Sequence, residues 1–299
     1  MRKNYYLHGF HSVSPSPWPM LTGVSVFNLA VGFIVWVKLG SPYFMLINLA
    51  TIAVIFGLWM RDIVREATYQ GAHTLRTVYM HKMGFYLFVL SEFMFFVSFF
   101  WAFAHAALSP SIEIGCKWPP EGIEAIRPWN LPALNTLTLI WSGLFASTSH
   151  HFVKGGKKDW AMKALAISIW LGIFFTIVQY IEFKNCPYTI ADSVFGSCFF
   201  ILTGFHGVHV LVGTIFLIVM YYRLKWGHFT INRHLGLECA ILYWHFVDGI
   251  WIAVFFIVYV WSYYEFPKDS WWPRPVVNSS WYNKINGGFY HKNKKWFKG

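Results

Sequence analysis

Charged residues are scarce in this sequence: Asp, Glu, Lys and Arg together make up 12% of the 299 residues. A soluble domain usually carries about a quarter charged residues, because water must cover its surface. Hydrophobic residues account for 56%, and the mean hydropathy is +0.44. This composition argues against a soluble protein and predicts a bundle of helices embedded in a bilayer.

Cysteines are few and scattered, and they form no CxxC pair. Cys198 and Cys239 lie in apolar runs, so we expect them to behave as small buried hydrophobic residues. Cys116 and Cys186 lie in two predicted loops on the same side of the membrane. A disulfide between them is an open alternative, because spacing alone does not establish pairing.

A removable presequence is also missing, since the first apolar run begins only after Pro19. A signal peptide would place its apolar core directly behind the basic start. The chain is therefore expected to be made in its own compartment or inserted without cleavage. We divide it into an N-terminal segment (1–19), a transmembrane domain (20–266) and a basic, aromatic C-terminal extension (267–299).

Seven apolar segments fill the transmembrane domain. A helix needs about 20 residues to cross about 30 Å of hydrocarbon, so each segment predicts one membrane-spanning helix of an all-α protein. The segments are 20–37, 43–60, 83–108, 134–153, 160–183, 191–222 and 239–264.

The basic residues predict the orientation of the bundle. Most Lys and Arg residues before the extension fall on the side that holds the N-terminus, and only Lys38, Lys117, Arg127 and Lys184 fall on the other. Such asymmetry favours an inner N-terminus and an outer C-terminus. The extension is either disordered or an arm for an acidic surface or anionic lipid. We expect no nucleic-acid partner, because there is no soluble basic domain.

Glu92 lies within an apolar span, nine residues after Met83 and therefore about 14 Å along the helix. An ionised carboxylate is costly at that depth, so we expect a protonated side chain at pH 7. Its hydrogen-bond partner is expected on another helix, at His206, His209 or His245. The group is either a satisfied structural acid or a proton-linked, reactive carboxyl.

Two further spans carry polar residues at helical spacing. His206 and His209 are predicted to share one face of the sixth span, and Gly204 and Gly207 are predicted to let a neighbouring helix approach closely. The seventh span carries a stripe of Glu238, His245 and Asp248. We interpret all five polar residues as contacts between helices.

Haem ligation is not favoured by these spacings. A dihaem helix would need two histidines about 13–14 residues apart to reach two membrane depths. The adjacent His150 and His151 point in different directions. We expect the chain itself to bind no haem, copper or zinc.

The segment 61–82 mixes Arg, Lys, Asp and Glu with His73, and Arg223 ends the sixth span on the same side. Its charges are either the ordinary inner flank of a membrane helix or a site for lipid headgroups.

Motifs along nearly the whole chain carry a resemblance to a known family. They are SPSPWP (14–19), RDIVREATYQGAH (61–73), SEFMFF (91–96), FFWAFAH (99–105), WPPEGI (118–123), FHGVHV (205–210) and YWHFVDGIW (243–251). In this order, over about residues 8–264, the sequence resembles the cytochrome c oxidase subunit III family.

The resemblance implies a fold in which the first two helices lean away from the other five and open a lipid-filled cleft. It implies a non-catalytic subunit without redox metal, packed chiefly on subunit I, which carries haem a, haem a3 and copper. The complex oxidises cytochrome c, reduces oxygen to water and pumps protons, while this subunit stabilises subunit I and supports proton uptake. Other subunits of the complex and phospholipids are implied partners, with cardiolipin as one candidate.

The resemblance also assigns residues. Glu92 falls on the family's buried, carbodiimide-reactive carboxylate, and the lipid-contacting positions are Trp59, Arg65, Glu66, His73 and Arg223. The family often has a second Trp where Met60 stands here, so one lipid-packing ring is missing.

Hydrophobicity and the missing presequence fit a multi-pass protein of the mitochondrial inner membrane, with a bacterial plasma membrane as the alternative. Other functions stay open at this point. They are a third subunit of a quinol oxidase, a stand-alone transporter with a proton path through Glu92, Asp248 and the histidines, and a membrane cytochrome.

Overall fold

The computed structural model describes residues 10–264 except 12, 14 and 121. The 267–299 extension and most of the 1–19 segment therefore lie outside the described residues. In chain order the elements are α1 (Trp18–Leu39), α2 (Tyr43–Thr68), α3 (Leu75–Leu108), the 3-10 turn η1 (Ile112–Ile114), α4 (Leu131–Lys154), α5 (Lys158–Lys184), α6 (Ser193–Lys225), α7 (Leu235–Val254), the π-helical turn η2 (Phe255–Val260) and α8 (Trp261–Tyr263).

The prediction of an all-α protein with seven long helices is confirmed, because α7, η2 and α8 run on as one span, Leu235–Tyr263. Six helices are apolar enough to cross a membrane by length and composition. The seventh, α4, is 24 residues long but more polar. Two of its serines face α5: the Ser142 and Ser168 hydroxyls each donate to the other residue's carbonyl at 2.9 Å, and Ser149 donates to the Ala161 carbonyl at 2.9 Å.

The predicted span boundaries at 60 and 83 are wrong as helix ends, and residues 61–82 are not a single loop, since α2 continues to Thr68 and α3 already begins at Leu75. The Thr74 hydroxyl caps α3 by accepting from the Thr77 amide at 3.3 Å. Hydropathy marks where a helix leaves hydrocarbon, not where it ends, and Arg, Lys and Glu are good helix formers in water. With 34 residues and a length of about 51 Å, α3 extends beyond the hydrocarbon.

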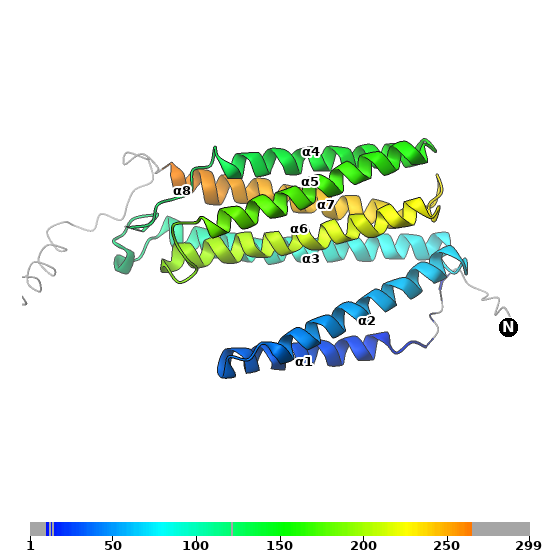
Figure 1. Ribbon diagram of the computed structural model, residues 1–299, viewed down its shortest axis with the longest axis horizontal. Helices are drawn as coiled ribbons and strands as arrows, with labels where there is room; N and C mark the ends of the chain where they lie inside the picture. The colour runs from blue at the N-terminus through cyan, green and yellow to red at the C-terminus, as the bar shows by residue number, and fades with distance from the viewer. Residues whose placement is uncertain (1–9, 12, 14, 121, 265–299) are drawn as a thin grey trace, which may run out of the picture.

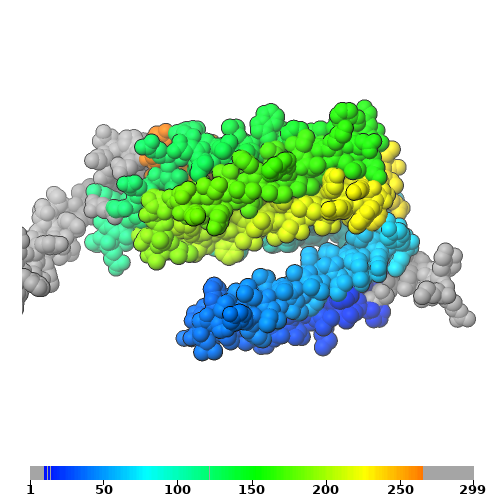
Figure 2. Space-filling view, viewed as in Figure 1, coloured from blue at the N-terminus to red at the C-terminus, as the bar shows by residue number. Residues whose placement is uncertain are grey.

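Two groups of helices make up the molecule (Figure 1). The α1–α2 pair lies apart from the bundle of α3 to α7. Figure 2 shows an open gap between the two groups that narrows towards the end of α2, where the chain passes into α3. The predicted division into two plus five helices is confirmed. The Trp18 indole donates to Asp62 Oδ2 at 2.8 Å and ties the start of α1 to α2.

Close packing in the five-helix bundle centres on Trp244 of α7, which is fully buried. A Cβ added at Gly172 of α5 or Gly213 of α6 would lie 2.7 or 2.8 Å from its ring, so both helices approach the indole through glycine. The indole N–H donates to Ser142 Oγ at 2.9 Å. The prediction for Gly204 and Gly207 is wrong, because a Cβ at either would meet nothing within 4 Å.

The two loop cysteines, Cys116 and Cys186, are both free, so the disulfide alternative is not realised. The ends predicted to be inner, where α2, α4 and α6 finish, lie together at one end of the molecule (Figure 1). Which membrane face that end occupies stays a prediction.

We expect Gly213→Ala to destabilise the folded chain by about 1–3 kcal/mol, because the new methyl group overpacks the Trp244 ring. Gly204→Ala is the matched control on the same helix, where the methyl group has open space. Thermal unfolding of both variants in detergent tests this. Equal unfolding temperatures for the two would contradict the packing account.

Candidate functional site

Glu92 of α3 pairs with His209 of α6 across the helix interface. Glu92 Oε2 lies 2.8 Å from His209 Nε2, and the side chains are 26% and 11% exposed. His209 Nδ1 lies 2.7 Å from the Phe205 carbonyl oxygen, which can only accept, so Nδ1 carries a hydrogen. The short Glu92–His209 contact therefore holds one proton, either on the carboxyl group or on Nε2. Of the three histidines expected as partners, His209 makes the contact.

Aromatic rings surround this pair. Phe96 lies with its centroid 4.8 Å from the His209 ring, and Tyr243 stacks on His209 at 6.5 Å. Phe95 approaches at 6.3 Å. The pair is thus a polar group with a transferable proton inside an apolar part of the bundle, where hydrogen bonds are strengthened by the low dielectric.

His206 reaches different helices from His209, although only three residues separate them. It is fully buried, and its Nε2 lies 3.1 Å from the Val247 carbonyl of α7. Its ring also packs on Trp251 at 4.9 Å and Phe175 at 5.8 Å. Positions three apart differ by about 60° around a helix. That rotation is enough for His206 to face α5 and α7 while His209 faces α3.

The stripe on α7 makes separate contacts and not one network. His245 Nε2 lies 2.7 Å from Ser147 Oγ of α4. A Cβ at Gly143 of α4 would lie 3.3 Å from Asp248 Oδ2, so Asp248 also faces α4. Asp248 Oδ1 is buried and has no hydrogen-bond partner among the described residues. Glu238 instead contacts Lys82 of α3, with Nζ and Oε2 3.1 Å apart.

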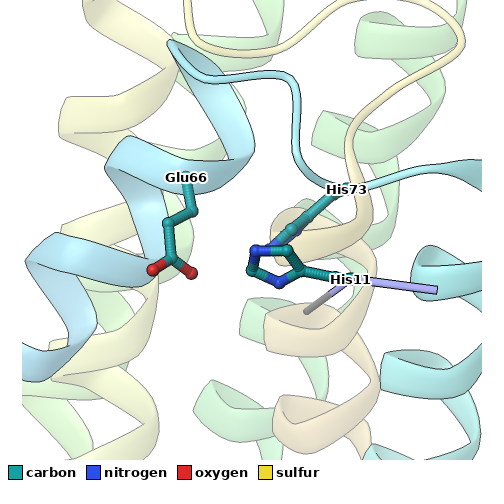
Figure 3. Close-up of side chains that lie close together, drawn as sticks. All are labelled: His11, Glu66 and His73. Atoms are coloured by element: carbon teal, nitrogen blue, oxygen red, sulfur yellow. The ribbon is translucent and has the colours of Figure 1, made fainter. Parts of the chain in front are cut away.

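A second group of polar residues gathers where α2 ends and α3 begins. Figure 3 shows the Glu66 carboxylate directed from α2 towards the rings of His11 and His73, and the three offer ligand atoms within 4.8 Å of one another. The His73 ring also lies 4.8 Å from the His81 ring. Burial, together with the nearby His81, His11 and Arg223, lowers the pKa of His73 to about 4. His73 is therefore neutral at pH 7.

Arg223 is a partly buried cation at the end of α6. Its guanidinium stacks on Phe229 at 4.6 Å, and a Cβ at Gly236 would lie 2.5 Å from Nη1. Its Nε is buried without a hydrogen-bond partner among the described residues. A guanidinium with an unused donor favours an anionic ligand such as phosphate.

The other two predicted lipid positions lie differently. Arg65 is 58% exposed and lies 4.0 Å from Asp62 on its own helix, while Trp59 is half-buried on α2. The structure thus brings Glu66, His73 and Arg223 into one region and leaves Arg65 on the surface. Near them, Tyr69 Oη lies 3.2 Å from His228 Nε2 and connects the end of α2 to the loop before α7.

Several buried polar residues of this bundle were not predicted from the sequence. Glu182 of α5 is 3% exposed and accepts a hydrogen bond from the Tyr259 hydroxyl at 2.6 Å. Asn135 donates to Gln179 nearby, at 3.2 Å. A Glu in an apolar run, as in FTIVQYIEFK, was a usable signal for Glu182. His11 and His150 gave no signal, because their partners are remote in sequence, and His234 was not singled out although Glu238 follows it four residues later.

Comparison with known proteins finds relatives along most of the chain. The family described as cytochrome c oxidase subunit III matches residues 8–263. Cytochrome c oxidase subunit 3 of Branchiostoma lanceolatum is 43% identical over 258 residues, which are 86% of this chain and 98% of that protein. The subunit 3 of Emericella nidulans is 44% identical over 264 residues, which are 88% of this chain and 98% of that protein. That of Marchantia polymorpha is 43% identical over 257 residues, covering 85% and 97%. The chain thus belongs to the cytochrome c oxidase subunit III family.

Proposed function

We propose that this chain is a non-redox subunit of a cytochrome c oxidase, which stabilises the catalytic subunit and supports proton uptake. The observation that best supports the proton role is the Glu92–His209 pair, which holds one proton between α3 and α6. Haem a, haem a3 and copper are assigned to partner subunits, chiefly subunit I. The proposed membrane is the mitochondrial inner membrane, which the chain crosses several times.

Apolar helix faces support an assembled role. Large side chains such as Phe27 of α1, Phe56 of α2 and Leu87 and Trp101 of α3 are more than half exposed. In a bilayer such faces contact lipid or the helices of another subunit, and both fit a chain that docks beside a catalytic partner.

Isolation of the complex tests this assembly directly. We expect the chain to migrate on a native gel with a large haem-bearing complex that oxidises cytochrome c. A stand-alone transporter would migrate alone or as a small homo-oligomer and would refute the proposal. A haem spectrum from the chain freed of its partners would point instead to a membrane cytochrome.

We propose further that phospholipid occupies the gap between α1–α2 and the five-helix bundle. The supporting features are the open space in Figure 2 and the Arg223 guanidinium with an unused Nε at its inner end. A phosphate group would pair with that cation, the neutral His73 would donate a hydrogen bond, and acyl chains would cover the apolar walls. Cardiolipin is one candidate, since it carries two phosphates.

Arg223→Met is expected to reduce the phospholipid that remains with the purified complex, because the phosphate loses its cation while the aliphatic packing is kept. Native mass spectrometry or phosphate analysis measures the lipid content. Arg233→Gln, an exposed position on the same side, is the control. Unchanged lipid content in the Arg223 variant would contradict the proposed headgroup site.

Glu92→Gln should leave assembly and oxygen reduction intact, because the amide keeps the size and can still donate to His209. We expect at most a modest change in the proton-to-electron ratio, and a change in the turnover lifetime of less than about tenfold, or about 1.4 kcal/mol. Ser91→Ala is the control, since the Ser91 hydroxyl donates to the Phe88 carbonyl of its own helix. Complete loss of oxygen reduction in an assembled Glu92→Gln complex would show that the carboxyl is essential to the chemistry and would refute the modulatory role.

A further inference from the structure

Two histidines and a glutamate converge where α4 ends and α7 begins. Glu238 Oε1 lies 3.2 Å from His234 Nε2 and 3.7 Å from His150 Nε2. The two imidazole centroids are 5.1 Å apart, and the three ligand atoms lie within 4.8 Å of one another. His150 comes from the last turns of α4, His234 lies at the residue before α7, and Glu238 lies in the first turn of α7.

The hydrogen bonds of His234 show that this cluster needs a positive charge at its centre. His234 Nδ1 lies 3.1 Å from the Thr230 carbonyl oxygen, which can only accept, so Nδ1 carries the hydrogen. In the neutral ring, Nε2 then presents a lone pair to the Glu238 carboxylate. Two acceptors 3.2 Å apart repel each other unless a proton or a metal ion lies between them.

Burial makes the need for a positive charge between the histidines and Glu238 stronger. His234 is 7% exposed, and the Nε2 atoms of both His150 and His234 are buried without a hydrogen-bond partner among the described residues. An unsatisfied buried polar atom is costly, and here two of them point at one oxygen. Lys82 Nζ lies 3.1 Å from the other oxygen, Oε2, and so leaves Oε1 free as a single ligand atom.

We propose that His150, His234 and Glu238 form a zinc site on the inner side of the bundle. Zinc binds nitrogen at about 2.0–2.1 Å and carboxylate oxygen at about 2.0–2.2 Å in a tetrahedron, which places neighbouring ligand atoms about 3.3–3.5 Å apart. The observed separations of 3.2 and 3.7 Å need only a small adjustment. The bond from His234 Nδ1 to a backbone carbonyl fixes the tautomer that exposes Nε2, as is usual for zinc-bound histidine.

The donor atoms favour zinc over magnesium or calcium, which prefer oxygen ligands. The proposal departs from the sequence-based expectation that this chain binds no metal. The other histidine cluster, His11 with Glu66 and His73 in Figure 3, is less suited to a cation. None of its members is fully buried, and the Arg223 charge acts on His73.

A bound zinc ion would join the end of α4 to the start of α7 and so stabilise the folded chain. We expect the full-length chain in detergent to bind one equivalent of Zn²⁺ from a buffered solution, with an unfolding temperature that rises with zinc and falls on chelation. X-ray absorption of the bound zinc should show two imidazoles and oxygen ligands. Co²⁺ in its place should give the intense visible bands of a tetrahedral site.

Substitutions test whether His234 and Glu238 are the residues that bind zinc. His234→Ala and Glu238→Gln should each weaken Zn²⁺ binding at least tenfold, while His151→Ala should bind as the unaltered chain does. His151 is the matched control, because it adjoins His150 but is exposed. His11→Ala should also leave binding unchanged, which separates this site from the cluster in Figure 3.

Zinc uptake and X-ray absorption of the unaltered chain test the proposed site even if a variant fails to fold. No zinc uptake by the folded chain, or an absorption spectrum without imidazole ligands, would overturn the proposal and leave a protonated histidine as the positive charge. Unweakened binding in the folded His234→Ala and Glu238→Gln variants would overturn it as well.

Discussion

Hydrocarbon offers no hydrogen-bond partners, so every polar side chain that this chain carries into the membrane must find its partner on the protein. The reciprocal bonds of Ser142 and Ser168, 2.9 Å each, show how α4 and α5 meet this constraint. Trp244 extends the same contact to α7 through its bond to Ser142. The polarity that sets α4 apart from the other spans is thus what attaches it to its neighbours.

The same need for a hydrogen-bond partner explains the contacts of two acidic residues, Glu92 and Glu182. Glu92 meets His209, and Glu182 meets Tyr259, in each case on another helix. A carboxyl group held this way stabilises the interface and keeps a proton at a defined position. Structural and proton-linked roles therefore do not exclude each other for Glu92, because both follow from the single proton between two acceptor atoms.

The α1–α2 pair stands outside this network of polar contacts. A Cβ at Gly32 of α1 would lie 2.9 Å from the Met45 Cα of α2, so the two helices pack closely on each other. Between this pair and the five-helix bundle, the gap visible in Figure 2 separates apolar surfaces. The contact of Tyr69 with His228 connects the two groups at the end of the molecule where α2 finishes. This arrangement leaves room for lipid to contact the apolar surfaces of both groups, which do not pack on each other across the gap.

Hydropathy and motif order are local properties, so the sequence alone was enough to predict the helical spans and, through the family resemblance, their two-plus-five division. It placed His206, His209 and His245 as inter-helix residues, but it could not say which of them would meet Glu92. It misplaced the close helix contact at Gly204 and Gly207, because the helix face that packs depends on the rotation of each helix in the bundle.

Contacts between residues of different helices, at the end where α2, α4 and α6 finish, could not be predicted from the sequence. His150 lies far from His234 and Glu238 in sequence, and Glu238 follows the same helical stripe as His245 yet turns to Lys82 and the two histidines. Likewise, His11 lies beside Glu66 and His73 although the whole of α1 separates it from them in sequence. The physical reason is that side-chain spacing along one helix is set by its 3.6-residue turn, whereas contacts between helices depend on how all seven pack.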